Sequence, residues 1–226
     1  MKKIEIKEFG GPEVLEIKNV DIGKPGQNEV LVKNLSIGIN YIDTYHRSGL
    51  YPIPLPSGIG LEACSIIEEV GSEVKLFKVG DRVTRASMPI GTYSEKQIIP
   101  EDKLVKVPDN ISDEVASCIT LKGITAEYLL HRTYQVKKGD KILYHAAAGA
   151  LGQIFCPWAN ALGAEIIGTV GSDEKIEIAK KNGCHHVINY NEKNFVEEVE
   201  KIVGKNGLDV VYDGVGAKTF EGSIEV

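Results

Sequence analysis

The feature that most constrains the fold is an alternation of strand-like and helix-like segments that begins near residue 140. The expected strands are residues 141–145, 165–170, 186–189 and 208–213, and the expected helices are 149–162, 173–182 and 192–203. Strands separated by helices of about ten residues or more predict a parallel sheet with right-handed crossovers. A doubly wound sheet of this type usually has six strands, ordered 3-2-1-4-5-6, and only four are visible here.

The first half of the chain is of a different kind. Short β-rich runs at residues 4–6, 14–17, 29–37, 63–70 and 82–85 are separated by turn signals such as Gly11-Pro12 and Gly80-Asp81. The segment Tyr51–Pro56 contains three prolines and is expected to be a loop. From about Ser112 the pattern changes from β-rich to helical: a helix start is expected at Ser112, and apolar residues have helical spacing in 125–134. We therefore expect two domains, 1–123 and 124–226.

Composition excludes several classes of protein. The net charge of −6 makes a phosphate-tracking basic surface, and hence nucleic-acid binding, unlikely. The four cysteines are dispersed, which favours neither a zinc ribbon nor a disulfide framework. The N-terminus has no apolar signal-peptide core. The uncharged stretch 142–164 contains three glycines and Pro157, so we expect a buried strand–loop–helix rather than a membrane span, no membrane association and a cytoplasmic location.

The loop between the first strand and helix of the second half has the composition of a phosphate-binding turn. It reads Ala146-Ala-Ala-Gly149-Ala-Leu-Gly152, a variant of G-x-G-x-x-G in which Ala147 occupies the first glycine position. Small residues let the backbone approach a pyrophosphate, and the helix N-terminus offers free N–H groups. The alternative is an ordinary tight turn, but the following helix and strand favour dinucleotide binding. Ala150 is compatible only with a negative φ, and Pro157 within the helix should cost ~3 kcal/mol.

The end of the second strand distinguishes NAD from NADP. NAD enzymes place a carboxylate there to bind the ribose 2′-hydroxyl, whereas this chain has Thr169-Val-Gly-Ser172, followed by Lys175. An ammonium group, the Ser172 hydroxyl and Tyr190 suit a 2′-phosphate. Alternatively, Lys175 is a solvated surface residue and Asp173 takes the acidic role. NADP is favoured over NAD.

Several longer motifs resemble those of a known family. They are Gly10-Gly-Pro-Glu-Val-Leu15, Ile37-Gly-Ile-Asn-Tyr-Ile-Asp-Thr-Tyr45, Arg47-Ser-Gly-Leu-Tyr51, Val79-Gly-Asp-Arg-Val83, Leu121-Lys-Gly-Ile-Thr125, and Gly139-Asp140 leading into His145-Ala-Ala-Ala-Gly149. The chain resembles the zeta-crystallin-like quinone oxidoreductases of the medium-chain dehydrogenase/reductase superfamily. The resemblance implies an α/β protein with a GroES-like, β-rich catalytic domain, an incomplete Rossmann domain, and NADPH in a cleft between them that reduces a quinone by hydride transfer.

The resemblance also implies roles for individual residues. Polar groups lining the quinone pocket would be Asn40, Tyr45 and Tyr51. Contacts near the nicotinamide are implied for Tyr41, Ile42, Asp43, Thr44, Tyr45, Thr125 and Tyr128. The pyrophosphate loop would be Gly149, Ala150, Leu151, Gly152 and Gln153, and the 2′-phosphate site Gly171, Ser172, Lys175 and Tyr190. From the residues alone, Tyr45 could instead be packing and Asn40 a turn residue.

Zinc chemistry is the main alternative within the superfamily. Zinc alcohol dehydrogenases have Gly-His-Glu where this chain has Gly60-Leu61-Glu62, and a cysteine within the segment that matches 37–43. Leucine cannot bind a metal, and a catalytic zinc needs three protein ligands. The five histidines do not supply that set, so no metal is expected.

The end of the sequence at Val226 motivates three further expectations. The last two Rossmann strands, with which relatives pair their subunits, are not visible, so any dimer should be irregular. The strand 208–213 would have an open apolar edge, and the chain should be less stable than one with those strands. The alternatives to a quinone reductase are a non-catalytic NADPH-binding protein that senses redox state or binds RNA, and an inactive truncated product.

Overall fold

The computed structural model describes residues 1–226 and divides into two compact units, Met1–Leu121 and Lys122–Val226. Unit 1 contains β1 (Lys2–Ile6), η1 (Pro12–Val14), β2 (Glu16–Asn19), β3 (Glu29–Gly38), α1 (Tyr41–Ser48), β4 (Ser57–Gly58), β5 (Glu62–Val70), β6 (Arg82–Ala86), β7 (Lys96–Pro100), η2 (Glu101–Lys103) and β8 (Val105–Lys106). Helix α2 (Asp113–Tyr128) begins in unit 1 and ends in unit 2. Unit 2 continues with η3 (Leu129–Thr133), β9 (Lys141–Tyr144), α3 (Gly152–Ala161), β10 (Glu165–Val170), η4 (Asp173–Lys175), α4 (Ile176–Lys181), β11 (His186–Asn189), α5 (Phe195–Val203), β12 (Val210–Tyr212) and α6 (Phe220–Glu225).

Unit 1 is built from two antiparallel sheets. One has the strand order β2-β1-β4 and the other has the order β7-β3-β5-β6-β8. Alternate residues of β3, among them Val30 and Val32, point into a core that also contains Ile67, Val83 and Ile99, all at most 1% exposed. This β-rich unit agrees with the expectation from the short strands and turns of the first half.

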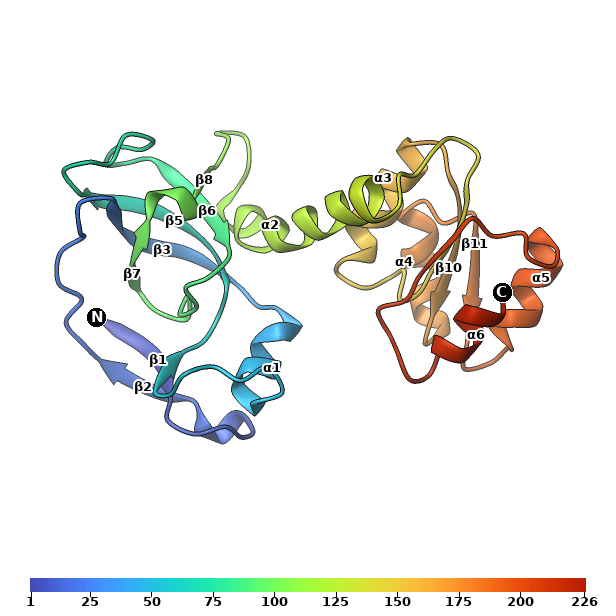
Figure 1. Cartoon of the computed structure of the whole chain (residues 1–226), viewed down its shortest axis with the longest axis horizontal. Coiled ribbons are helices and arrows are strands. Elements are labelled where there is room, and N and C mark those ends of the chain that lie inside the picture. The colour runs from blue at the N-terminus through green and yellow to red at the C-terminus, as the bar shows by residue number, and fades with distance from the viewer. The chain divides into compact units, whose positions relative to one another are not determined.

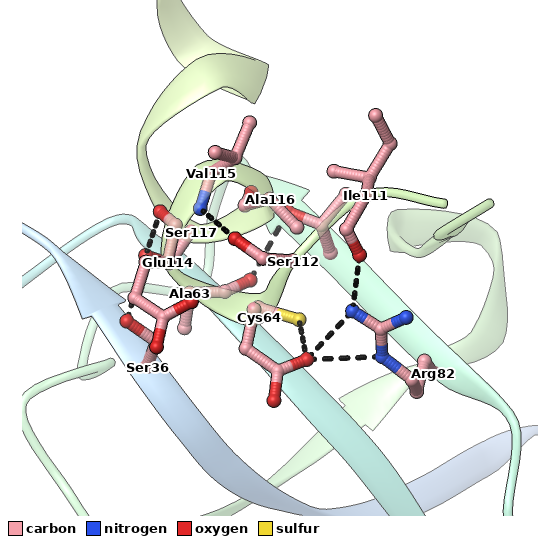
Figure 2. Close-up of polar contacts among 12 residues, drawn as sticks. Ser36, Ala63, Cys64, Arg82, Ile111, Ser112, Glu114, Val115, Ala116 and Ser117 are labelled. Carbon is pink, nitrogen blue, oxygen red and sulfur yellow. Dashed lines mark hydrogen bonds and ion pairs between the residues drawn. The ribbon is translucent and has the colours of Figure 1, made fainter. Parts of the chain in front are cut away.

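The start of α2 is fixed to the larger sheet by polar contacts, several of which Figure 2 shows. The Arg82 guanidinium bonds to the Asp113 carboxylate and donates to the Ile111 carbonyl oxygen at 2.6 Å. The hydroxyl groups of Ser36 and Ser117 lie 2.9 Å apart. Together these contacts hold the first turns of α2 on β3 and β6.

Unit 2 is a parallel sheet with helices on both faces. Its order is β11-β10-β9-β12, which is the 3-2-1-4 order expected from the sequence. Ile142 and Ile166 face a core shared with α3 and α4, whereas Leu143 and Ile167 face α5. Figure 1 shows α3 and α4 on one side of β10 and β11, and α5 on the other. Strand β12 lies at one edge of this sheet, as expected.

Several boundaries differ from the sequence-based expectation. The strand expected at 14–17 lies at Glu16–Asn19, because Pro12–Val14 form a 3-10 turn. The helical pattern of 125–134 is the end of α2 followed by the π-helical turn η3. Helix α3 begins at Gly152 rather than residue 149, and it continues through Pro157. Helix α1 and strands β4, β7 and β8 were not expected from the sequence.

Candidate functional site

In unit 1, the expected pocket residues gather around helix α1. Asn40 is the N-cap of the helix and Tyr41 is its first residue. The Tyr45 ring centroid lies 5.3 Å from that of Tyr41 and 5.2 Å from that of Tyr51. Tyr41 and Tyr51 are 76% and 50% exposed. The structure therefore presents three neighbouring tyrosines, two of them at the surface of unit 1, beside a buried asparagine.

The side chain of Asp43 points away from this surface. It is 3% exposed, and its Oδ2 accepts hydrogen bonds from the Asn40 amide and the Tyr93 hydroxyl, both at 2.9 Å. Burial raises the pKa of Asp43, although both hydrogen bonds and the nearby His46 oppose the rise. Asp43 therefore fixes the start of α1 from within, in the manner of a capping residue.

Asn40 is held by a second buried carboxylate, Glu62. The Asn40 Nδ2 donates to Glu62 Oε2 at 2.8 Å, and the Leu121 backbone N–H donates to Glu62 Oε1 at 2.7 Å. Glu62 is fully buried. The hydrogen bond to Glu62 fixes the orientation of the Asn40 carboxamide. The roles of Asp43 and Glu62 in positioning Asn40 were not predicted from the sequence. For Asp43 the available signal was the Asn40-x-x-Asp43 spacing, which is typical of a capping box.

In unit 2, the glycine-rich loop has the form of an anion-binding turn. The backbone N–H groups of Ala150, Leu151 and Gly152 make no hydrogen bond within the protein, and α3 begins at Gly152. A Cβ atom at Gly152 would lie 2.4 Å from the Ala147 carbonyl oxygen, so only glycine fits the close approach of loop and helix. Ala150 does not have a positive φ, as the sequence required of a residue with a methyl group. Free N–H groups at a helix N-terminus fit a pyrophosphate.

The expected 2′-phosphate residues meet at the carboxyl end of β10. A Cβ atom at Gly171 would lie 2.9 Å from the Tyr190 hydroxyl, and the Lys175 amide donates to the Ser172 carbonyl at 3.1 Å. Lys175 is exposed, and its ammonium group makes no ion pair. The Asp173 carboxylate instead accepts a hydrogen bond from Asn189 Nδ2 at 2.8 Å.

That last contact bears on cofactor preference. Asn189 uses one acceptor position of the Asp173 carboxylate, while the exposed Lys175 ammonium is available to an anion. The remaining expected residues on this side are Thr125 and Tyr128, on the part of α2 that belongs to unit 2, and Gln153 in the first turn of α3.

A buried polar network beneath the loop was not expected from the sequence. His145 is 2% exposed; its Nδ1 lies 2.8 Å from Thr169 Oγ1 and its Nε2 lies 3.0 Å from Ser223 Oγ. Ser223 Oγ also donates to Asp213 Oδ2 at 2.7 Å. The network joins the ends of β9, β10 and β12 to α6.

Comparisons with known proteins place the chain in a family. A family described as "alcohol dehydrogenase GroES-like domain" matches residues 26–109, and one described as "zinc-binding dehydrogenase" matches residues 150–226. The "quinone oxidoreductase" of Pseudomonas aeruginosa is 48% identical over 225 residues, which cover 99% of this chain and 69% of that protein. The chain belongs to the quinone oxidoreductase family of the medium-chain dehydrogenase/reductase superfamily.

Solved structures in this family share the fold. The structure titled as Escherichia coli quinone oxidoreductase complexed with NADPH has a TM-score of 0.95 and 49% identity, and it matches all of this chain and 69% of its own. A "2-haloacrylate reductase" of a Burkholderia species is 47% identical over 97% of this chain and 68% of that protein. The GroES-like and Rossmann-type units expected from the sequence are thereby confirmed.

The residues of the chain do not fit a catalytic zinc, despite the name of the second matching family. No group of three or more His, Cys, Asp or Glu side chains is placed to hold a metal ion. Leu61 is buried, and the Cys64 sulfur lies 3.6 Å from the Asp113 carboxylate. None of the helices has the length and apolar character needed to cross a membrane.

The structure thus collects the expected residues of this family member into two groups. In unit 1, Asn40 is the N-cap of α1, Tyr51 follows the helix, and the first five residues of α1 are Tyr41, Ile42, Asp43, Thr44 and Tyr45. Gly149, Ala150, Leu151, Gly152 and Gln153 in unit 2 form the loop and first turn of α3, and Gly171, Ser172, Lys175 and Tyr190 lie at the end of β10. The single cleft expected from the resemblance stays a prediction.

Proposed function

We propose that the chain is an NADPH-dependent, zinc-independent quinone reductase. The observation that carries the proposal is the 48–49% identity to quinone oxidoreductases over 99% of the chain, together with a glycine loop whose free N–H groups fit a pyrophosphate. Bound NADPH supplies a hydride for an electron-poor acceptor. The chain's own contribution is to bind, orient and exclude water.

Each group of residues has a role in this proposal. The Ala150, Leu151 and Gly152 amides bind the pyrophosphate at the N-terminus of α3. Tyr45 and Tyr51, with the oriented carboxamide of Asn40, line the acceptor pocket. A reduced quinone is a weak base, so protons from water or a tyrosine hydroxyl suffice and no dedicated general acid is required.

We further infer a preference for NADPH over NADH. Lys175 is the exposed cation at the end of β10, and Asp173 is engaged by Asn189. Replacement Lys175→Ala removes a charge-assisted contact, which is worth roughly 1.5–3 kcal/mol, or about tenfold to a hundredfold in NADPH affinity. The NADH affinity should change little. Equal losses for both cofactors in equilibrium titrations would assign the 2′ site to another residue.

The acceptor class is tested together with the cofactor. Quinones and 2-haloacrylates share a carbon that is conjugated to a carbonyl group and accepts hydride, and a 2-haloacrylate reductase is among the relatives. Steady-state turnover of NADPH with 1,2-naphthoquinone and with 2-chloroacrylate separates these two substrates. NADPH binding without turnover of either compound would instead support a non-catalytic NADPH-binding protein, and no binding would support an inactive product.

A further inference from the structure

The turn that opens the glycine loop contains a left-handed alanine. Ala146 has φ +58°, a conformation that is disfavoured for residues with a Cβ atom. Asn206 is the other non-glycine residue with a positive φ. Because such a conformation persists only where its surroundings impose it, the contacts of the two residues that flank Ala146 are informative.

Both flanking residues are bonded to one residue of β10, Thr169. The Ala147 backbone N–H donates to the Thr169 carbonyl oxygen at 3.0 Å, and the His145 side chain contacts the Thr169 hydroxyl at 2.8 Å. Thr169 is fully buried. Ala146 is thus held between two hydrogen bonds to the same residue of the neighbouring strand.

The proton positions in this arrangement follow from its neighbours. The Ser223 hydroxyl has a single hydrogen. Its Oγ lies 2.7 Å from the Asp213 carboxylate and 2.8 Å from the Thr219 carbonyl oxygen, and both of these groups can only accept a hydrogen bond. The charged Asp213 carboxylate is the strongest acceptor around Ser223, so we assign the Ser223 hydrogen to Asp213 and the hydrogen between His145 and Ser223 to His145 Nε2. In the neutral imidazole Nδ1 is then an acceptor, and it receives the Thr169 hydroxyl hydrogen.

The surroundings favour the neutral imidazole. Burial lowers the pKa of His145, although the charge of Asp213 opposes this. The Phe195 ring packs edge-on against the imidazole with centroids 5.0 Å apart. The ring is therefore fixed in orientation by contacts on both nitrogens and on its side.

We propose that His145 and Thr169 are positioning residues for the cofactor: the hydrogen bond from the Thr169 hydroxyl to His145 Nδ1 holds Ala146 in its left-handed conformation and thereby sets the amides of the glycine loop for a pyrophosphate. The inference rests on the proposed function, because it concerns the same NADPH site. It assigns no chemistry to His145, which is buried and contributes through the loop.

The test compares NADPH affinity in variants of this clamp. Thr169→Val removes the hydroxyl at nearly constant volume, and Thr169→Ser, the matched control, retains it. Loss of one hydrogen bond should raise the NADPH Kd of Thr169→Val by about fivefold to tenfold, with kcat at saturating NADPH within about twofold of wild type. Thr169→Ser should stay within about twofold of the wild-type Kd.

A rescue separates positioning from general destabilisation. Glycine adopts a positive φ without penalty, so Ala146→Gly in the Thr169→Val background should restore the NADPH Kd, whereas a merely structural role of Thr169 would leave it weakened. If Thr169→Val does not fold, His145→Asn and His145→Gln replace it. The Asn carboxamide oxygen can accept at the Nδ1 position, whereas Gln extends toward Ser223, so Asn should bind NADPH more tightly than Gln.

The outcomes distinguish this inference from the proposed function. Wild-type protein that neither binds NADPH nor reduces 1,2-naphthoquinone would overturn the proposed function. Wild-type protein that binds NADPH, together with an unchanged Kd in Thr169→Val or no rescue by Ala146→Gly, would overturn the positioning role and leave the function standing.

Discussion

Replacing Asp213 by asparagine should destabilise unit 2 in a manner that depends on pH. The carboxylate accepts four hydrogen bonds: from the Val215 and Gly216 amides at 2.9 and 3.0 Å, from the Thr219 hydroxyl at 2.9 Å, and from the Ser223 hydroxyl at 2.7 Å. Although burial by itself raises the pKa of Asp213, these bonds lower it to about 2, from an ordinary 3.8.

The magnitude follows from this shift. At about 1.4 kcal/mol per pK unit the fall corresponds to roughly 2.4 kcal/mol of preference for the charged form in the folded protein. The carboxylate is partly exposed, so solvent screening reduces the contribution to about 1–2 kcal/mol. Because the folded pKa is lowered, this stability is present above pH 4 and is lost as the pH falls toward 2.

Urea unfolding followed by Trp158 fluorescence measures the effect, since Trp158 is the only tryptophan and packs against the core of unit 2. The free energy of unfolding of Asp213→Asn should lie about 1–2 kcal/mol below that of wild type at pH 7, and the two values should converge between pH 4 and the lowest pH at which both still fold. Glu174→Gln is the control, because Glu174 is exposed and makes no hydrogen bond in η4. A difference that is constant with pH would refute the assignment to the Asp213 charge.

Three other outcomes are expected. Gly38→Ala should lower the free energy of unfolding by about 3 kcal/mol in thermal denaturation, because its Cβ would lie 1.9 Å from the Ser117 carbonyl oxygen. Gly123→Ala should raise it by about 0.5–1 kcal/mol, because Gly123 lies inside α2 and a Cβ there would meet no atom within 4 Å. Equal effects of the two substitutions would contradict the packing argument. Tyr93→Phe removes a donor to the buried Asp43 and should cost about 1–3 kcal/mol at pH 7. The cost should be smaller at a pH where Asp43 is protonated, because the Tyr93 hydrogen bond opposes the rise in the Asp43 pKa caused by burial and so stabilises the charged carboxylate; a pH-independent loss would speak against this. Treatment with 1,10-phenanthroline should leave quinone turnover unchanged, and inhibition reversed by added zinc would reveal a metal requirement.

The second half of the chain was predictable because its strands are continuous apolar runs between helices. The limits of β10 and β11 agree with the sequence expectation, and so does the order of the sheet. The first half was harder. Strand β7 carries Lys96 and Gln97 and ends at Pro100, so it lacks the apolar alternation that identifies a strand. Helix α1 is eight residues long, and tyrosine and threonine are weak helix formers.

The two halves of the candidate site were predictable to different depths. The glycine loop follows from local composition, because it needs small residues between a strand and a helix. The network of His145, Asp213 and Ser223 does not, because the contacting side chains of His145 and Ser223 are 78 residues apart in the chain. Such pairings depend on the order of strands in the sheet, and no single segment encodes them.

The distribution of burial in unit 2 has a consequence for how cofactor preference can change. Thr169 and His145, which support the loop, are 0% and 2% exposed, so substitutions there disturb the core as well as the ligand. Lys175, five residues beyond the end of β10, is exposed. Surface positions tolerate most exchanges within about 0.5 kcal/mol. Substitutions at the end of β10 can therefore change the selectivity between NADPH and NADH at little cost in stability. Substitutions that abolish dinucleotide binding through Thr169 or His145 would also disturb the core.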